Sequence, residues 1–317
     1  MSFDAAQHRA HLKDFPEYIT AGNLKNNYMW QTQKYGRLLM QKSTRQPLNI
    51  IMVGCVEAYR FNCGPAGTCF KLDVAGLEKS KQQFHLGKPA EELFAEDFMR
   101  AVTVLEKLQT ATAKTKEKKN LIVKEYDETM VRFMHRLFKK REKPILQPKK
   151  FGTYLEDLEN PSELEQQEDC EMVDEETDLW PVPPHLAKEL ERIKYNFITN
   201  PLPIYKDEEF VGPAAVEKCM SEALVEVTFN LEHYAIFKQN EPVHDTFDAD
   251  ILQVNILKDG DDTPLSAFKL HDVHEGPVKL QKKRSLVMSA EEPAAKKTKK
   301  NDDGNATTSQ KGKQKEV

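Results

Sequence analysis

The sequence has no apolar run long enough to cross a bilayer. Its most apolar stretch, Asn49–Val53, has five residues, whereas a membrane-spanning helix needs about 20. The first residues, Met1 to Asp4, are polar and acidic, so they are not expected to act as a secretory signal. No contact with a membrane is therefore expected.

Paired cysteines are also missing. The five cysteines are scattered, and no Cys-x-x-Cys motif occurs. This pattern is typical of reduced thiols in or near the core of an intracellular protein. Cys55, Cys63, Cys69 and His85 do not have the spacing of a zinc site. No metal or other cofactor is expected.

Recognisable catalytic motifs are absent as well. There is no Gly-x-Ser-x-Gly elbow, kinase signature or Rossmann fingerprint. The turn Gly64–Thr68 lacks the lysine that a phosphate-binding loop needs, so a structural turn is expected there. One enzymatic alternative stays open, in which Asp248 and Asp250 support metal-dependent phosphoryl transfer. A solvent-exposed sheet face explains these two residues without any catalysis and is the favoured explanation.

Charge is strongly segregated along the chain. The formal net charge is only -5, but 31% of the residues are charged. No Lys or Arg occurs between Phe151 and Ala187, where acidic residues cluster before a proline-rich stretch. We therefore predict a flexible acidic linker at 151–183. No aromatic residue follows Phe268, so 281–317 is predicted to be a disordered basic tail.

The N-terminal region, residues 1–150, is predicted to mix strands and helices. Apolar runs separated by a Gly-Pro turn predict strands within 48–74. Apolar residues at 4-3-4-3 spacing predict a helix at 89–109. A second helix is predicted at 121–142, ended by Pro144. The two helices would pack as an antiparallel hairpin over 89–143.

A second unit is predicted at 184–280. Short helices at 184–194 and 213–221 each begin with a proline. Apolar and polar residues then alternate, which predicts a β-hairpin over 223–257 with its loop at 238–245. The alternation changes phase at Leu252, which indicates a β-bulge, and the hairpin is expected to pack on the strands at 48–74. The predicted fold class is α+β: an antiparallel sheet with a helical hairpin, an acidic linker and a disordered basic C-terminal tail.

Two basic clusters in the tail are separated by eleven residues. They resemble a bipartite nuclear localisation signal, because two cationic segments on a flexible spacer can reach two acidic grooves of an import receptor at once. The expected import residues are Lys282, Lys283, Arg284, Lys296, Lys297, Lys299 and Lys300. The alternative is a tail that only keeps the protein soluble.

Basic residues in and beyond the second predicted helix recur at the spacing of one helix face. They are Arg132, Arg136, Lys139, Lys140, Lys143, Lys149 and Lys150. Cations on one face would bind phosphates with an affinity that falls steeply with salt. The acidic block could also occupy this face and compete with a polyanion. An ordinary solvated helix face is the alternative explanation.

Part of the second unit carries a set of short segments with a shared resemblance. They are Asn200–Tyr205, Phe210–Pro213, Ala223–Phe229, His233–Tyr234 and Thr246–Ile251. Together they resemble a segment found in proteins of mushroom-forming fungi. These relatives are uncharacterised, so the resemblance brings no activity with it. It implies a folded unit within 180–270.

Three function classes follow from these features. The leading prediction is a non-enzymatic nuclear protein that binds an import receptor and a further protein partner. The alternative is a nucleic-acid-binding protein that uses the basic residues at 132–150. The second alternative is the phosphoryl-transfer enzyme with Asp248 and Asp250. Nucleic-acid binding at two salt concentrations would separate the second class from the first.

Overall fold

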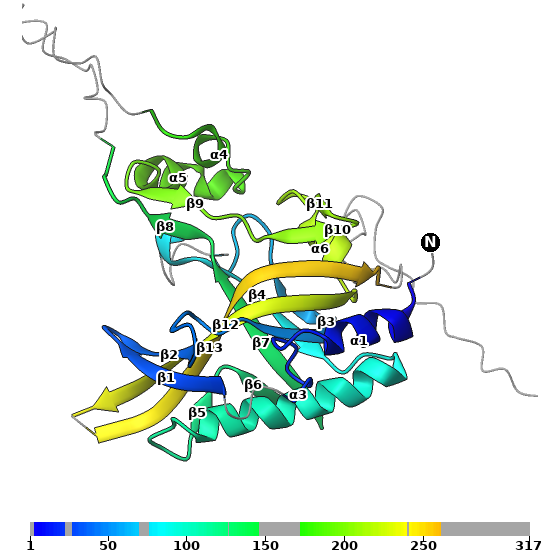
Figure 1. The fold of residues 1–317 in the computed structure, drawn as a ribbon. Coiled ribbons are helices and arrows are strands. Elements are labelled where there is room, and N and C mark those ends of the chain that lie inside the picture. Colours follow the sequence, from blue (N-terminus) through cyan, green and yellow to red (C-terminus); the bar gives the residue numbers. More distant parts are fainter. Residues whose placement is uncertain are drawn as a thin grey trace, which may run out of the picture. The chain divides into compact units, whose positions relative to one another are not determined.

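The structure is a computed structural model, and it describes residues 3–22, 27–69, 76–125, 127–145, 172–239 and 241–260. The described part combines helices with a dominant sheet, which confirms the predicted α+β class (Figure 1). The predicted tail at 281–317 and residues 151–171 of the predicted acidic linker lie outside the described residues. No helix in the described ranges is both long and apolar enough to span a membrane.

Five strands close into a barrel. They are β3 (Ile50–Asn62), β4 (Lys81–Gly87), β7 (Glu128–Arg136), β12 (Leu224–Lys238) and β13 (Glu241–Lys258). Their order around the barrel is β12-β3-β4-β7-β13, and β13 pairs again with β12. All of these pairings are antiparallel except the short parallel contact between β7 and β13. The predicted regions 1–150 and 184–280 therefore share one sheet.

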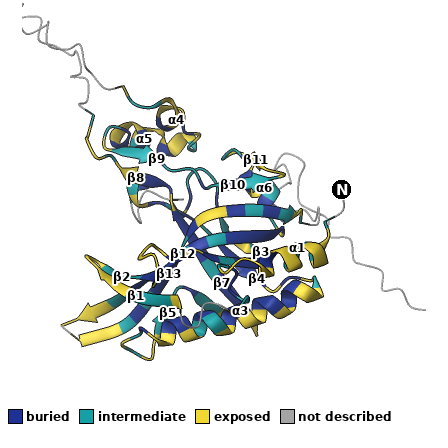
Figure 2. Ribbon diagram, in the orientation of Figure 1, coloured by how far each residue is buried: buried dark blue, intermediate teal, exposed yellow. Residues whose placement is uncertain are grey.

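Large apolar side chains from the barrel strands fill its interior. Figure 2 shows long buried stretches along these strands. Phe84, Phe133 and Phe229 are fully buried, and the Phe133 ring centre lies 5.6 Å from that of Phe84 and 5.0 Å from that of Phe229. Aromatic pairs at these separations stabilise a core beyond simple area burial. The alternation predicted for β12 is confirmed, because Val225, Val227, Phe229 and Leu231 all point inward.

The predicted bulge in the long hairpin is confirmed. Thr228 pairs with Gln253 and the next residue, Phe229, pairs with Ile251, so Leu252 is the extra residue in β13. The bulge lets both halves of β13 bury their apolar side chains although the alternation changes phase. The connecting loop, however, is shorter than the predicted 238–245, because β12 runs to Lys238 and β13 begins at Glu241. The hairpin therefore extends further than its apolar pattern indicates.

Further strands extend the sheet on both sides of the barrel. The β1–β2 hairpin (Tyr28–Gln33 and Gly36–Gln41) joins β12, and the β10–β11 hairpin (Ile204–Lys206 and Glu209–Phe210) joins β13. β5 (Lys118–Lys119) pairs in parallel with β13, and β6 (Ile122–Glu125) pairs with β7.

The helix predicted at 89–109 is confirmed as α3 (Glu92–Thr110). Its face with Phe98, Ala101 and Leu105 joins the barrel core. The N-terminal helix α1 (Ala5–Lys13) lies beside it.

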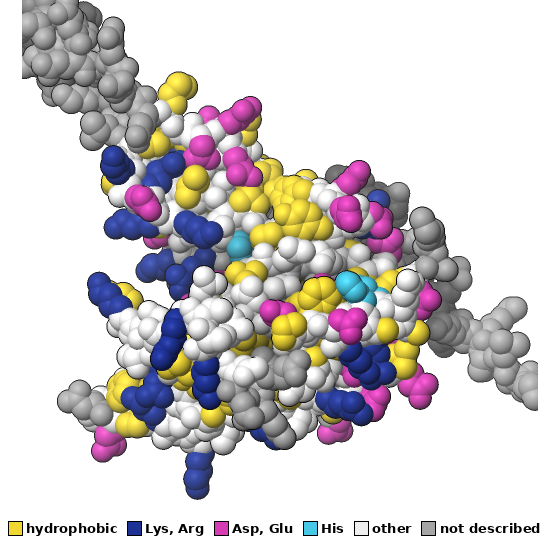
Figure 3. Space-filling model, in the orientation of Figure 1, with side chains coloured by type: hydrophobic (Ala, Val, Ile, Leu, Met, Phe, Trp, Pro, Cys, Tyr) yellow, Lys and Arg dark blue, Asp and Glu magenta, His cyan; other side chains and the backbone are white. Residues whose placement is uncertain are grey.

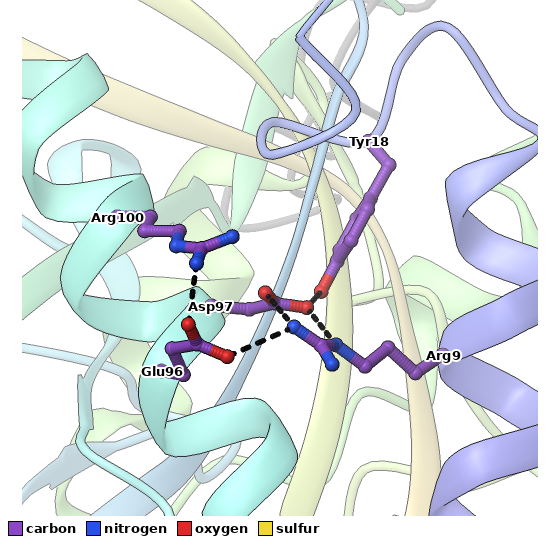
Figure 4. Close-up of polar contacts among 5 residues, drawn as sticks. All are labelled: Arg9, Tyr18, Glu96, Asp97 and Arg100. Atoms are coloured by element: carbon purple, nitrogen blue, oxygen red, sulfur yellow. Dashed lines mark hydrogen bonds and ion pairs between the residues drawn. The ribbon is translucent and has the colours of Figure 1, made fainter.

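A buried polar network joins α1 to α3 (Figure 4). The Arg9 guanidinium donates two hydrogen bonds of 2.7 Å to the Asp97 carboxylate, and the Tyr18 hydroxyl donates a third of 2.9 Å. Burial opposes ionisation of Asp97, but the bonds from Arg9 and Tyr18 outweigh it and lower the pKa of Asp97. Arg9 also contacts Glu96, which pairs with the exposed Arg100.

The helix predicted at 121–142 is wrong, and so is the helical hairpin at 89–143. This segment forms β6, β7 and β8 (Phe138–Lys140). Val131 and Phe133 enter the barrel core because β7 pairs with β4 over six residue pairs. Long-range pairing overrides a helical periodicity that the local sequence also satisfies.

A small second core lies next to the barrel strands. It packs β8 against β9 (Phe197–Thr199) and α5 (Ala187–Ile193), and α6 (Val216–Met220) follows later in the chain. These helices confirm the two predicted at 184–194 and 213–221.

The end of the predicted acidic linker is folded, which corrects the flexible linker over 172–183. Residues 175–178 form the short helix α4 (Glu175–Asp178), capped by the Asp174 side chain. Arg141 pairs with Asp174, and Trp180 is only 4% exposed. Burial of the indole and this ion pair offset the repulsion among the acidic residues.

Candidate nucleic-acid interface

Three segments far apart in the sequence meet at one end of the long hairpin. In the pairing of β2 with β12, Leu38 lies opposite Glu232 and Arg37 lies opposite His233. In the pairing of β5 with β13, Lys118 lies opposite Asp245. The ends of the β1–β2 and β12–β13 hairpins and the chain between α3 and β5 therefore lie side by side (Figure 1). This is where aromatic and basic side chains collect.

A hollow of about 270 Å³ lies between these segments, and we call it the hairpin groove. Tyr35, Tyr234 and Phe237 supply its aromatic rings, and Arg37 and Lys114 supply its cations. The volume is small for a drug-sized ligand but suits one planar ring system. Rings beside cations are the elements from which stacking sites for nucleic acids are built.

Gly36 allows the two hairpins to approach closely. Its φ of +138° lies in the region that favours glycine, and a Cβ atom there would lie 2.5 Å from the His233 carbonyl oxygen and 2.8 Å from the Tyr234 ring. A side chain at this position would push β2 away from β12. The wall of the hairpin groove therefore depends on the absence of a side chain at Gly36.

Two of the rings in the groove are exposed and already lie close to a cation. Tyr35 is 73% exposed and Phe237 52% exposed. The Lys34 ammonium lies 5.0 Å from the centre of the Tyr35 ring, and the Lys114 ammonium lies 5.1 Å from that of Phe237. Exposed rings with cations nearby can stack on a base while the cations meet its phosphates.

The surroundings of the groove are basic. Figure 3 shows Lys and Arg side chains over both hairpins, with apolar side chains between them. Further cations of the three segments are Lys116, Lys118, Lys119 and Lys238. Glu117 pairs with Lys119 at 3.1 Å, so part of this charge is neutralised locally. The remaining positive charge favours a polyanion.

Under the groove lies an aromatic cluster that holds the two hairpins together. The His233 ring stacks on Phe247 with centres 4.7 Å apart, and Trp30 from β1 meets both rings edge-on at 6.0 and 6.2 Å. Because Trp30, His233 and Phe247 come from β1, β12 and β13, this cluster fixes the hairpins relative to one another.

The structure places the predicted basic residues on and after two strands and not on one helix face. Arg132 and Arg136 belong to β7, Lys139 and Lys140 to β8, and the exposed Lys143 follows β8. Neighbouring strand residues such as Lys139 and Lys140 point to opposite sides. Lys149 and Lys150 lie outside the described residues, as do all seven expected import residues. The prediction of a basic helix face is wrong because the segment is not a helix.

Arg132 is half-buried and lies opposite His85 in the β4–β7 pairing. Burial and the nearby Arg132 and Arg60 lower the pKa of His85 to about 4. Burial also lowers the pKa of Arg132, whose Nη1 donates a long hydrogen bond of 3.4 Å to Asn120. In contrast, Arg136 is exposed at the end of β7. Of these two arginines, only Arg136 is free to meet solvent fully.

Asp248 and Asp250 lie on the outer face of β13. Asp248 is 9% exposed, accepts a 3.4 Å hydrogen bond from Asn120 and lies 4.0 Å from the Lys81 ammonium. Within the described ranges, no group of three or more His, Cys, Asp or Glu residues is arranged to hold a metal ion.

The groove residues themselves were not predicted from the sequence. The segment 110–120, which supplies Lys114, has only a polar pattern. The sequence offers a weak local signal, an aromatic residue next to a lysine at Lys34-Tyr35 and at Phe237-Lys238.

Comparison with known proteins gives distant structural similarity and no relative by sequence. No family model and no curated protein matches the chain. The solved structures that match include gp2.5, a single-stranded DNA-binding protein encoded by bacteriophage T7, at 9% identity and a TM-score of 0.34 over 68% of this chain and 93% of that one. The single-stranded DNA-binding protein from bacteriophage Enc34 matches at 9% identity and a TM-score of 0.33 over 75% of this chain and 93% of that one. Scores below 0.5 fall short of a shared fold, and nothing about the ligand of this chain follows from them.

Proposed function

We propose that the chain binds single-stranded nucleic acid in the hairpin groove. The observation that carries this proposal is the meeting of Tyr35, Tyr234 and Phe237 with Arg37 and Lys114 in one hollow. The rings would stack on unpaired bases, and the cations would contact the adjoining phosphates. Nucleic-acid binding is the alternative function that the sequence predicts, but the proposed site is the hairpin groove and not the basic residues at 132–150.

A single strand fits the groove better than a duplex. In a duplex both faces of each base are covered by its neighbours, so the rings of the groove would find no free face. A single strand offers unstacked bases at little cost. We therefore expect a clear preference for single-stranded over double-stranded oligonucleotides.

The barrel itself agrees with this function without assigning it. Five-stranded barrels of the OB type bind oligonucleotides and oligosaccharides in many proteins. A fold alone does not determine a ligand, however. The residues of the groove are what distinguish an oligonucleotide from an oligosaccharide here. An oligosaccharide would need hydrogen-bonding groups more than it needs cations, and the cations Arg37 and Lys114 favour the polyanion.

The test is fluorescence anisotropy with labelled single- and double-stranded oligonucleotides of the same sequence. The full chain should bind the single strand more tightly, with an affinity that falls between about 50 and 200 mM salt. Tyr35→Ala and Phe237→Ala should each weaken binding about 5- to 150-fold, because stacking on a base contributes about 1–3 kcal/mol.

Phe210→Ala is the matched control. Phe210 is 50% exposed, much like Phe237, but it lies on β11, away from the groove. Its replacement should leave the affinity unchanged. Absence of binding at low salt would contradict the function, and equal losses for Phe210→Ala and Phe237→Ala would contradict the site.

We also propose that the tail delivers the protein to the nucleus, through the two basic clusters at 282–284 and 296–300. Their charge and spacing support recognition by an import receptor. A fluorescent fusion of the full chain should accumulate in the nucleus, and it should lose this accumulation when the lysines and arginine of both clusters are replaced by alanine. Equal accumulation of the two forms would refute the proposal.

A further inference from the structure

Asp245 lies where the segments around the hairpin groove meet. Its side chain is fully buried. The carboxylate accepts hydrogen bonds from the backbone N–H groups of Lys114 (3.0 and 3.1 Å) and Thr115 (2.6 Å) and from the Thr115 hydroxyl (2.6 Å). A fourth donor is His233 Nε2 at 2.6 Å. One side chain of β13 thus holds the chain between α3 and β5.

Asp245 is held in its ionised form. Burial opposes ionisation, but hydrogen bonds from Thr115, from His233 and from the backbone of Lys114 and Thr115 outweigh it and lower the pKa of Asp245 to about 2. Since an ionised carboxylate can only accept, His233 Nε2 must carry the proton of their hydrogen bond. Among the described residues, His233 Nδ1 has no hydrogen-bond partner, so Asp245 is the polar contact that orients this ring.

Lys114 is the link between Asp245 and the groove. Its backbone N–H is bound to Asp245, while its ammonium group reaches back to the Phe237 ring of the same hairpin, 5.1 Å from the centre. The backbone N–H of Asp245 in turn donates to the Glu117 carbonyl at 2.9 Å. The segment from Lys114 to Glu117 is therefore held to β13 by both the side chain and the backbone of Asp245.

We propose that Asp245 is a positioning residue for nucleic-acid binding: its buried carboxylate fixes the backbone at Lys114 so that the ammonium stands ready in the hairpin groove. This inference rests on the proposed function. The benefit is preorganisation, because a loop that is already ordered does not lose conformational freedom when the ligand binds. Asp245 itself makes no contact with the ligand.

A double-mutant cycle tests the role, with Lys114→Ala, Asp245→Asn and the combination measured by anisotropy with the single-stranded oligonucleotide. Asn keeps the shape but replaces one acceptor oxygen with an NH₂ group that faces N–H donors. Each single change should weaken binding about 3- to 10-fold, and the combination should weaken it no more than the stronger single change. Each should also reduce the salt slope by about 0.7, the value for one phosphate contact on a single strand.

Thr115 supplies a milder pair of variants if Asp245→Asn unfolds the chain. Thr115→Val removes the hydroxyl donor and should weaken binding in a way that is again not additive with Lys114→Ala, whereas Thr115→Ser keeps the hydroxyl and should restore wild-type affinity. A residue that only stabilises the fold would lower the melting temperature without changing the salt slope. If the two single losses of affinity multiply in the double variant, Asp245 does not act through Lys114, and the positioning role is wrong although the chain still binds. If the unmodified chain binds no oligonucleotide, the proposed function itself is wrong.

Discussion

Glu232 and Asp248 face each other as directly paired residues on the outer side of β12 and β13. Like charges in this position repel across a sheet. Asp250, two residues further along the same face, lies near both. Burial and then the Glu232 and Asp248 carboxylates raise the pKa of Asp250 to about 6, although Arg136 and Lys139 act in the opposite direction.

Asp250→Asn should therefore stabilise the protein at neutral pH. The folded state holds the Asp250 proton more tightly than the unfolded chain does, so this group favours folding below about pH 4 and loses that contribution as pH rises through about 6. At pH 7.5 the neutral amide should raise the free energy of unfolding by about 1–3 kcal/mol, and the gain should disappear below about pH 4. Urea unfolding of wild type and variant at several pH values measures the gain at pH 7.5 and its disappearance in acid. The exposed Asp14→Asn is the control and should change stability by less than about 0.5 kcal/mol.

Gly36→Ala should destabilise the junction of the two hairpins. The new Cβ atom would meet the His233 carbonyl oxygen at 2.5 Å in a backbone conformation that L-residues avoid. We expect a loss of about 2 kcal/mol or more in unfolding free energy and weaker oligonucleotide binding, because Tyr234 also lines the groove. Gly212→Ala, where nothing lies within 4 Å of the added atom, is the control and should be neutral or slightly stabilising. A Gly36→Ala protein as stable as the Gly212→Ala protein would show that the close approach is not required.

Asp97→Asn should be costly because it removes the buried carboxylate from Arg9 and leaves it only the more exposed Glu96, at 3.3 Å. The Arg9 side chain is 14% exposed and that of Asp97 3%. We expect a loss of about 2–4 kcal/mol at pH 7, measured by chemical unfolding. The pKa of Asp97 is lowered in the folded state, so its contribution is present above about pH 4 and is lost as pH falls through the folded-state value. Wild type and variant should therefore converge in acid.

Arg100→Ala provides the contrast within the same network. Arg100 and Glu96 form an i,i+4 pair whose side chains are 58% and 53% exposed. Pairs this exposed contribute little, so the variant should lose less than about 0.5 kcal/mol. If both variants lose the same stability, burial is not what gives the Arg9–Asp97 pair its importance.

The elements that could be predicted are those whose signals are local. The alternation around Val227 and Phe229, the phase change at Leu252 and the apolar stripe of α3 each lie within one short window. The pairing of the long hairpin with the strands at 48–74 was also expected, because a lone hairpin is marginal in water. β12 and β3 confirm it.

The elements that could not be predicted depend on distant partners. Met130, Phe133 and Leu137 have the spacing of a helix stripe, whereas Val131 and Phe133 have the spacing of one strand face. Only the pairing with β4 decides between the two. The hairpin groove is a stronger case, since Tyr35, Lys114 and Phe237 come from three segments and no local pattern connects them. The burial of Trp180 could not be predicted either, because the many acidic residues before it give this part of the chain the composition of a linker.

Trp180 should prove essential for the small second core. Its indole is 4% exposed, and Nε1 donates a 2.8 Å hydrogen bond to the Pro65 carbonyl in the turn after β3. Trp180→Phe keeps a ring but leaves that carbonyl unpaired, so it should cost about 1–2 kcal/mol, whereas Trp180→Ala also opens a cavity and should cost about 3–5 kcal/mol. The neighbouring Leu179 is 68% exposed, and Leu179→Ala should change stability by less than about 0.5 kcal/mol. Urea unfolding followed by circular dichroism gives all three values. If the segment were the flexible acidic linker that the composition of 151–183 predicts, none of the three variants should change the free energy of unfolding. A larger loss for Trp180→Ala than for Trp180→Phe, with none for Leu179→Ala, would show that the segment is folded.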